Sequence, residues 1–361
     1  MLNGLRGRKQ WSLSVAALVI ALMLAACGSQ NRAPSSTDSA NTTEQNIQQT
    51  IQESAGQSGV EPKGKIYVSY PSIPDLGDVA SLLAWEEMGR MGYEVIPKFM
   101  AESELAVEAV MRDDAQLGIT SSPIFAAIDK GAPLVNVVST LRNEWTLIGR
   151  GDVKTLQDLE GKRLGQHSPA AIGKAMTDAV LEANAPDVNP NVIYIAGSEN
   201  RADALLRDQL DASPVEIVDL VRLMNEAPGK FNIVSSYAQD LSGLIGLTMF
   251  VKNDYMEKNP QVVKDAIKAL LTVYQRAKEE PDFIVENAPK YLPSLEENIL
   301  KEAAELYHEY DLWPADGDMD EETQKYTVDF WTEQGLLENN LSYEAYFDRT
   351  LLDEVLQEMG Q

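Results

Sequence analysis

The sequence predicts an α/β protein of two similar lobes, and three observations lead to this prediction. From about residue 65 onward, short β-rich runs alternate with helical runs of apolar residues, which is typical of mostly parallel sheets. The alternation stops near residue 140 and restarts after residue 160. A motif also occurs twice, because residues 108–113 and 203–208 both read as an acid, Ala, two apolar residues and Arg-Asp. We interpret the repeat as one helix–strand–turn element present in each lobe, with a chance match between two short helices as the alternative.

The first lobe is expected to begin with strands and helices in strict alternation. Each strand is short and rich in β-branched or aromatic residues, and each helix has apolar residues at helical spacing. The first helix stops at Gly92, a residue that favours helix ends. The strands are expected at 65–70, 93–99, 115–120 and 133–141, and the helices at 78–92, 103–114 and 122–131.

The second lobe repeats this order, and the chain then returns to the first lobe. Strands are expected at 163–166, 191–196, 211–213 and 231–237, and helices at 169–184, 199–210 and 214–225. A further strand is expected at 243–252, and after Asn259-Pro260 the pattern is almost entirely helical. The fold class is therefore a two-lobed α/β fold with a helical C-terminal extension.

The composition limits the possible partners. The chain has 361 residues, enough for two domains, with a formal net charge of −26 and a pI of about 4.4. Nucleic acid and anionic lipid repel a chain of this charge, so we expect neither as a direct partner. Carboxylates far outnumber Lys and Arg between residues 279 and 358, which we interpret as a solvated acidic face. We expect a monomer.

The N-terminal residues read as an export signal. A positive start is followed by the apolar stretch WSLSVAALVIALMLAA, which is too short to span a bilayer comfortably. It ends in LAAC at residues 24–27, which resembles the bacterial lipobox and implies cleavage before Cys27 and a diacylglyceryl group on its thiol. We therefore expect a signal peptide at 1–26, lipidation at Cys27, and a flexible polar tether at 27–63. An ordinary signal peptide with an incidental Cys is the alternative.

Three Ser-Pro pairs follow short strands and precede helical runs, at residues 122–123, 168–169 and 213–214. Ser is a preferred N-cap and Pro a preferred first helical residue, so the pairs are consistent with well-made helix starts. Ligands of open α/β sheets also bind at this edge, where helix N-termini present N–H groups. Candidate ligand-binding residues lie in the turns at this edge and near the crossovers between the lobes: Tyr70, Ser121, Ser122, Asn143, Trp145, His167, Ser168, Ser213, Glu216 and Tyr237.

Residues of about 65–291 resemble a known family. The segments IYVSYPS, AVEAVMRDDAQLGITSSPIFAAIDKGAPLVNVV, TLQDLEGKRLG, ADALLRDQLDAS and NPQVVKDAIKALLTVY carry the resemblance. The chain resembles the periplasmic-binding-protein-like solute-binding components of ABC transporters, in the branch that serves nitrate, sulfonates, taurine and the thiamine pyrimidine precursor. The resemblance implies two lobes joined by two crossovers that close on a small molecule. We expect lobe 1 at 64–140 and 247–361, and lobe 2 at 141–246.

This resemblance implies a location and partners. We expect an extracytoplasmic protein, held to the cell membrane by its lipid and facing the periplasm or cell surface, that delivers its ligand to an ABC permease with its ATPase. A lipoprotein that senses the same ligand and signals to a receptor is an alternative.

The ligand prediction depends on a departure from the family pattern. Many members carry Trp-x-Pro-Tyr-like residues after the second Asp-Ala, whereas this chain reads DASPVEIVDL and places Glu216 there. A carboxylate disfavours an anionic ligand and suits a donor-bearing ring or a cationic amine, although Glu216 could simply complement a helix dipole. Tyr70, Trp145 and Tyr237 could stack on a ring. We therefore expect a heterocyclic vitamin or precursor, such as riboflavin or thiamine pyrimidine, with a sulfonate, taurine or nitrate as the alternative.

The residues do not indicate an enzyme. The chain has only two histidines, His167 and His308, and its single Cys is the expected lipidation site. These cannot form an ordinary zinc site or a Cys-His pair, and the sequence has no Gly-x-Ser-x-Gly elbow and no phosphate-binding glycine loop. Thiamine-pyrimidine synthases are similar to this family, but they use an iron site rich in His and Cys, which this chain lacks. We expect no catalytic residue, no cofactor and no metal.

Overall fold

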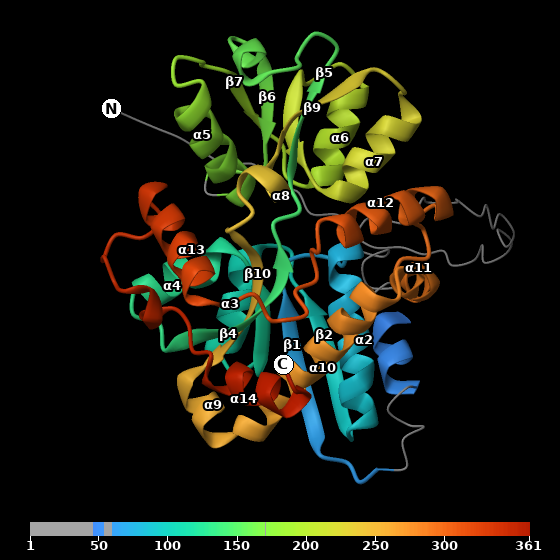
Figure 1. Ribbon diagram of the computed structural model, residues 1–361, viewed down its shortest axis with the longest axis vertical. Helices are drawn as coiled ribbons and strands as arrows, with labels where there is room; N and C mark the ends of the chain where they lie inside the picture. The colour runs from blue at the N-terminus through green and yellow to red at the C-terminus, as the bar shows by residue number, and fades with distance from the viewer. Residues whose placement is uncertain (1–45, 54–59, 170) are drawn as a thin grey trace, which may run out of the picture.

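The computed structural model describes residues 46–53, 60–169 and 171–361, and it contains two five-stranded sheets, one in each lobe (Figure 1). The sheet of lobe 1 has the order β2-β1-β3-β10-β4, and that of lobe 2 has the order β7-β6-β8-β5-β9. The first sheet comprises β1 (Gly64–Tyr70), β2 (Tyr93–Phe99), β3 (Leu117–Thr120), β4 (Leu134–Arg142) and β10 (Ile245–Lys252). The second comprises β5 (Thr146–Arg150), β6 (Arg163–Gln166), β7 (Asn191–Tyr194), β8 (Ala212–Val215) and β9 (Phe231–Ser236). The prediction of a two-lobed α/β fold is confirmed.

One strand in each sheet runs against the other strands. In lobe 1, β10 is antiparallel to both β3 and β4, while β1 is parallel to β2 and β3. In lobe 2, β5 is antiparallel to β8 and β9, while β6 is parallel to β7 and β8. The reversed strands are those on which the chain enters a lobe from the other, so the sheets are mostly parallel as expected.

Helices follow the strands in both lobes. Lobe 1 has α2 (Leu76–Arg90), α3 (Ser103–Met111) and α4 (Ser122–Asp129), and lobe 2 has α5 (Ile172–Asn184), α6 (Ser198–Leu206), α7 (Ile217–Glu226) and the short α8 (Tyr237–Asp240), with a 3-10 turn η1 at Leu156–Leu159. The extension comprises α9 (Asn253–Lys258), α10 (Pro260–Glu279), α11 (Asp282–Asn287), α12 (Glu297–Glu309), α13 (Glu321–Glu333) and α14 (Thr350–Met359), with 3-10 turns η2 at Ala288–Lys290 and η3 at Tyr343–Ala345.

Two sequence expectations about lobe 2 are wrong, and they share one cause. The strand β5 was not predicted, and Ser213-Pro214 does not begin a helix. Both residues lie in β8, where they pair with Ile148 and Leu147 of β5. The pairing with β5 extends β8 beyond the predicted strand end, so α7 begins only after Glu216.

The other Ser-Pro pairs also differ from the expected caps. At residues 121–123, Ser121 occupies the N-cap position of α4 and Pro lies in the first turn, but the Ser121 side chain makes no capping hydrogen bond. Ser168-Pro169 precedes α5, whose N-cap position is Ala171. Thus Ser122-Pro123 alone lies at a helix start, with Ser121 in the N-cap position that was expected for Ser122.

The two crossovers between the lobes lie against each other. Asn143 Nδ2 donates to the Tyr237 carbonyl at 3.1 Å, and Tyr237 N donates to the Trp145 carbonyl at 3.0 Å. A Cβ on Gly246 would lie 2.5 Å from the Arg142 carbonyl oxygen, so only glycine allows the backbones to approach this closely. The side chain of Asn143 therefore joins the crossovers.

The C-terminal extension contacts both lobes. Helix α10 packs on α2, and α14 packs on α10, all within lobe 1. Helix α12 instead packs on α7 of lobe 2, where Asn225 Nδ2 donates to Glu302 Oε2 at 2.7 Å (Figure 1). Leu306 of α12 contacts the apolar cores of both lobes. The expected lobe 1 segment 247–361 thus includes α12, a helix that also packs against lobe 2.

Part of the expected tether is helical. Residues 46–53 form a helix, and Ile47 and Ile51 on it are fully buried in the core of lobe 1. Apolar residues four positions apart share one helix face, which explains how a polar segment contributes to a core. Cys27 and the predicted signal peptide at 1–26 lie outside the described residues. Across the part of the chain that the structure describes, none of the helices is both long and apolar enough to span a membrane.

Candidate functional site

Four carboxylates meet where the two lobes face each other, and we call Asp75, Asp78, Glu144 and Glu216 the carboxylate cluster. Asp75 and Asp78 lie at the N-terminus of α2 in lobe 1, Glu144 lies in the first crossover, and Glu216 precedes α7 in lobe 2. A Cβ on Gly77 would lie 3.1 Å from Asp75 Oδ1 and 3.5 Å from Glu144 Oε1. Thr146 of β5 pairs with Val215 of β8, which places Glu144 and Glu216 at the same end of this strand pair. The charge of Asp75 also raises the pKa of each of the other three carboxyl groups. Both lobes therefore contribute to one candidate site.

Asp75 and Asp78 are fixed by a capping box at the start of α2. Asp75 Oδ1 accepts from Gly77 N at 2.8 Å and from Asp78 N at 3.3 Å, and Asp78 Oδ2 accepts from Asp75 N at 3.2 Å. These bonds satisfy N–H groups that a helix N-terminus otherwise leaves free. Burial nevertheless raises the pKa of Asp75 to about 6, and burial followed by the charge of Asp75 raises the pKa of Asp78 well above its ordinary range.

Glu144 is held by the C-terminal extension. The Tyr307 hydroxyl on α12 donates to Glu144 Oε2, while Oε1 lies 3.5 Å from the position that a Cβ on Gly77 would occupy. Tyr307 stacks on Trp313 with ring centroids 4.9 Å apart, and Trp313 Nε1 donates to the Gly77 carbonyl at 3.0 Å. Tyr307 and Trp313 thus lie against the N-terminus of α2. Burial, and next the charges of Asp75 and Glu216, raise the pKa of Glu144.

Glu216 occupies the N-cap position of α7, but its side chain makes no capping hydrogen bond. Its backbone N–H donates to Ser198 Oγ at 3.0 Å, and among the described residues we find no hydrogen bond or ion pair to its carboxylate. Burial and the charges of Asp75 and Asp219 raise its pKa, and only the charge of Arg201 opposes them. Glu216 therefore contributes an unpaired carboxylate to the cluster.

Arg201 is the cation nearest to this carboxylate, and its guanidinium is fully buried. Nε donates to Ser213 Oγ at 3.1 Å, Nη2 to the Pro214 carbonyl at 3.2 Å, and Nη1 to the Ile195 carbonyl at 3.2 Å. It also lies 5.7 Å from the ring centroid of Trp145. Arg201 thus supports the end of β8 and one face of Trp145 and forms no ion pair with the cluster.

The three candidate aromatic residues occupy different environments. Tyr70 is fully buried in lobe 1, where its hydroxyl lies 2.7 Å from Ser81 Oγ and accepts from Trp85 Nε1 at 2.6 Å. Tyr237 is also fully buried, and its hydroxyl donates to Thr177 Oγ1 at 2.9 Å. Trp145 is only half-buried. Of these rings, Trp145 alone retains surface for a ligand.

Two of the hydroxyl and imidazole candidates, Ser213 and His167, are engaged by neighbouring backbone. Ser213 is fully buried, and its hydroxyl lies 3.2 Å from the Gly165 carbonyl oxygen. Gly197 N donates to His167 Nδ1 at 3.1 Å. Ser122 is buried, whereas Ser121 and Ser168 are half-buried. Glu216 is therefore the sequence candidate that the structure brings into the carboxylate cluster.

Sequence reasoning missed most of the cluster. Asp75 and Asp78 could have been found, because a capping box directly after the first strand places acids at the ligand-binding edge. Glu144 follows the candidate Asn143 and carried no signal of its own. Tyr307 and Trp313 come from the helical extension, whose packing the sequence pattern does not reveal.

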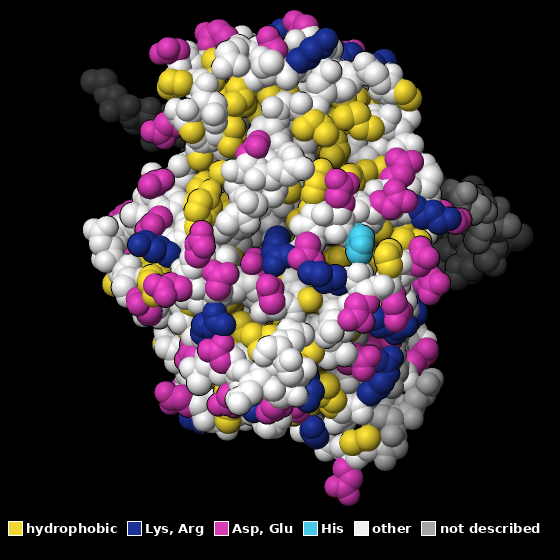
Figure 2. Space-filling model, in the orientation of Figure 1, with side chains coloured by type: hydrophobic (Ala, Val, Ile, Leu, Met, Phe, Trp, Pro, Cys, Tyr) yellow, Lys and Arg dark blue, Asp and Glu magenta, His cyan; other side chains and the backbone are white. Residues whose placement is uncertain are grey.

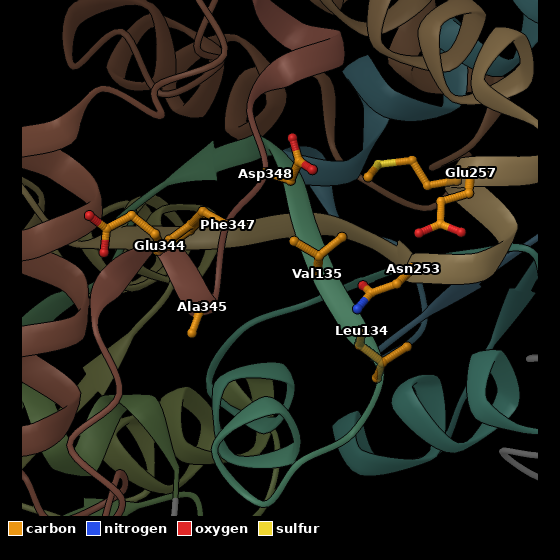
Figure 3. Close-up of a pocket in the computed structure, with 9 residues that line it drawn as sticks. Leu134, Val135, Asn253, Glu257, Glu344, Ala345, Phe347 and Asp348 are labelled. Carbon is orange, nitrogen blue, oxygen red and sulfur yellow. The ribbon is translucent and has the colours of Figure 1, made fainter.

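A separate cavity of about 290 Å³ lies on lobe 1, away from the cluster (Figure 3). It is lined by the start of β4, by α9 and by the segment around η3, and Glu257, Glu344 and Asp348 are among its lining residues. Nothing from lobe 2 lines it, so lobe closure would not enclose a ligand there. Within the described residues, no group of His, Cys, Asp and Glu side chains is arranged to hold a metal ion.

Comparisons with known proteins agree with this architecture. The family model described as NMT1/THI5 like matches residues 91–284, more than half of the chain. The alkanesulfonate-binding protein SsuA from Xanthomonas axonopodis pv. citri, bound to MOPS, has a TM-score of 0.61 and 16% identity, covering 80% of this chain and 99% of that one. The periplasmic sulfonate-binding protein SsuA from Methylobacillus flagellatus KT has a TM-score of 0.64 and 14% identity, covering 83% of this chain and 96% of that one.

The periplasmic nitrate-binding protein NrtA from Synechocystis PCC 6803 has a TM-score of 0.61 and 11% identity, covering 83% of this chain and 90% of that one. At these identities the structural likeness establishes the fold alone. None of the curated proteins compared matches the chain.

Proposed function

The chain belongs to the NMT1/THI5-like family, and from this premise we propose that it is the extracytoplasmic solute-binding component of an ABC importer. The observation that supports the proposal is the carboxylate cluster, to which the N-terminus of α2 in lobe 1 and the residue before α7 in lobe 2 both contribute. A site shared by two lobes closes when a ligand binds both. The shared fold of the sulfonate-binding and nitrate-binding proteins supports this assignment.

We propose that the ligand is a small organic nutrient, with a heterocyclic vitamin or precursor such as riboflavin or thiamine pyrimidine as the leading candidates. The half-buried ring of Trp145 and the hydrogen-bond acceptors of the cluster suit a ring that carries donors. A sulfonate, taurine or nitrate is the second candidate, and the names of the structural relatives favour it. We disfavour an enzyme of the thiamine-pyrimidine-synthase type, because the cluster consists of carboxylates and the chain has no His- and Cys-rich set.

A ligand panel tests the solute-binding proposal. We expect one of riboflavin, thiamine pyrimidine, taurine, alkanesulfonates or nitrate to raise the melting temperature of the purified chain. At a concentration a hundred times its Kd, the ligand adds about 2.7 kcal/mol to the free energy of unfolding. Small-angle scattering on the same samples should show a smaller radius of gyration with that ligand. If none of these compounds and no cationic heterocycle stabilises the protein, the result would contradict the proposal.

We propose that acyl chains on Cys27 anchor the protein beside its permease and ATPase. The support is the sequence around residues 24–27 and the acidic body, which has no attraction of its own for anionic lipid. Cys27→Ala is therefore expected to move the protein from the membrane fraction to the soluble fraction, as measured by fractionation and immunoblotting. Persistence of Cys27→Ala in the membrane fraction would exclude the lipid anchor. A sensing role with the same anchor is separated by whether a permease and an ATPase are encoded beside the gene.

A further inference from the structure

We propose that the ligand is an organic cation and that the carboxylate cluster holds its positively charged nitrogen between the lobes. This inference rests on the proposed function, because it assigns a ligand class to the same site. An amine or amidine on a small ring satisfies the geometry, since its N–H groups can point at carboxylates from both sides. The inference separates this chain from relatives whose names describe anion binding.

Carboxylates at both helix N-termini of the site disfavour the binding of an anion. Asp75 Oδ1 already accepts from Gly77 N and Asp78 N, so the protein's own carboxylate takes the position that an oxyanion would need at α2. On the opposite side, the N-cap position of α7 is Glu216, a second carboxylate. An anion entering here would meet negative charge at both helices, whereas a cation would be attracted by both.

The cluster differs from the acidic surface in its charge balance. Asp and Glu side chains are scattered over the face shown in Figure 2, with Lys and Arg side chains among them. For example, Arg142 contacts Asp311 at 2.7 Å, Asp316 at 3.3 Å and Asp318 at 3.2 Å. Across the described residues, no salt bridge joins a Lys or Arg to any member of the cluster. Buried charges are normally paired, so the cluster lacks a counter-charge that a bound cation would supply.

Two buried polar atoms beside the cluster also lack partners. The Tyr274 hydroxyl on α10 is fully buried without a hydrogen bond, and burial, followed by the nearby Tyr70 and Asp78, raises its pKa. Gln166 Oε1, on a side chain 1% exposed at the end of β6, also has no donor. A Cβ on Gly173 would lie 3.9 Å from this oxygen, which places it under the first turn of α5 at the cleft edge of lobe 2.

These orphaned atoms point to a ligand because buried polar groups are normally satisfied. Gln166 Oε1 can only accept a hydrogen bond, so it requires a donor. The carboxylates require donors as well. A protonated amine or amidine offers several N–H donors and one positive charge, and so satisfies both requirements, whereas a sulfonate or nitrate offers only acceptors.

The aromatic groups near the site favour a cation too. The guanidinium of Arg201 lies 5.7 Å from the centroid of the Trp145 ring, so one face of this ring already has a cationic neighbour and the ring's remaining surface is open to a ligand. On the other side, Tyr307 and Trp313 form a stacked pair against Glu144 and α2. A bare metal ion is a poorer occupant, because the described carboxylates are not arranged as a metal site.

Three pyrimidines that share one ring and differ in the charge of one substituent test the inference. The probes are 4-amino-2-methylpyrimidine carrying aminomethyl, hydroxymethyl or carboxyl at position 5, compared with benzamidine, riboflavin, taurine and nitrate by calorimetry at pH 7.5. We expect the aminomethyl probe or benzamidine to bind at least tenfold more tightly than the neutral and anionic compounds. Tightest binding of the carboxyl probe, taurine, nitrate or riboflavin would overturn the inference and leave the solute-binding proposal standing. Binding of none of them would contradict both proposals.

Charge-neutralising variants give two further readouts, and one of them needs no ligand. Glu216→Gln is expected to weaken binding of the cationic probe at least tenfold, while Glu199→Gln on the exposed surface of α6 leaves it unchanged. Because like charges repel in the empty site, the double variant Glu144→Gln, Glu216→Gln should melt several degrees higher than the parent at pH 8 without ligand. A lower melting temperature for this double variant would show that the carboxylates are structural, and would overturn the inference.

Discussion

Replacement of Arg201 by Ala is expected to lower the free energy of unfolding by about 3 kcal/mol or more, the largest effect we expect from a single substitution near the site. Arg201 is fully buried and donates to Ser213 Oγ and to the carbonyls of Pro214 and Ile195. Removal of the guanidinium leaves these acceptors buried without a donor, and it opens a cavity beside Trp145. Urea unfolding followed by circular dichroism measures the change.

A matched control lies on the same part of the chain. Arg207 follows α6 and forms an exposed ion pair with Asp203 at 2.9 Å, so Arg207→Ala should cost less than about 1 kcal/mol. Arg201→Lys should recover only part of the stability, because an ammonium cannot reach three separated acceptors. If Arg201→Ala were no more destabilised than Arg207→Ala, the hydrogen bonds of the guanidinium would contribute little to the stability of lobe 2.

This prediction matters for the site because Arg201 positions the end of β8. The residue after that strand is Glu216, whose backbone N–H is bound by Ser198 at the start of α6. Ser198 and Arg201, both in the first half of α6, thus link this helix to the segment that carries the lobe 2 carboxylate. A substitution at position 201 that leaves the protein folded should therefore also weaken ligand binding, and the weakening should appear as a faster dissociation rate.

The fold could be predicted further than the site, and the repeated strand–helix pattern explains why. Periodicity in residues 65–141 and 163–252 reports which residues face a core, and those faces determined both sheets. The strand β5 was missed because it follows β4 after only three residues and has no helix between them. Missing β5 also caused the error at β8, because β5 is the strand with which Ser213 and Pro214 pair.

The site depends on contacts that periodicity does not encode. Glu216 was found because it departs from a family pattern. Tyr307 and Glu144 are separated by 163 positions, and neither has a local signal that it meets the other. Tyr70 shows the opposite error, because an aromatic residue at a strand end was expected to face a ligand and instead fills the core beside Trp85. Local sequence pattern predicts the edge of the sheet at which the carboxylate cluster lies, while side-chain placement there depends on distant segments.

Lowering the pH from 8 to 5 is expected to stabilise the ligand-free protein, contrary to the usual behaviour of an acidic protein with paired carboxylates. All four carboxyl groups of the cluster have a raised pKa, first because of burial and then because of neighbouring carboxylates. A raised pKa means that the folded state binds more protons than the unfolded state, so stability falls as the pH rises from the ordinary pKa to the raised one. For Asp75, whose pKa moves from 3.8 to about 6, this loss is about 3 kcal/mol across that window.

The charged and titratable groups that face the cluster come from every element packed around it: Asp75 and Asp78 on α2, Arg201 on α6, Asp219 on α7, Tyr274 on α10 and Tyr307 on α12. Arg201 stays charged throughout this range, and the tyrosines, whose pKa values burial raises, stay neutral. Asp219 adds to the effect, because burial raises its pKa as well. The sign of the pH dependence in this window is therefore set by the carboxyl groups.

Other carboxyl groups limit the stabilisation at the acidic end. Hydrogen bonds from Glu338 N and the Tyr346 hydroxyl lower the pKa of Asp129 despite its burial, and Arg163 lowers the pKa of Asp211. Their contribution is present above the ordinary pKa near 3.8 and is lost below it, so stability should reach a maximum between about pH 4 and 6. Thermal melts at constant ionic strength measure this profile.

The cluster can be identified as the source of the profile. Glu144→Gln, Glu216→Gln should flatten the loss of stability between pH 5 and 8, whereas Glu199→Gln, whose charge contributes to the raised pKa of Asp219, should change it much less. A bound cation should flatten it in the same way, because the ligand supplies the counter-charge that protons supply at low pH. Cation binding should correspondingly weaken as the pH falls toward 5, since protons then compete for the same oxygens. A melting temperature that rises from pH 5 to pH 8 would mean that the carboxylates are paired in the folded protein, and that the cleft has no need of a positive ligand.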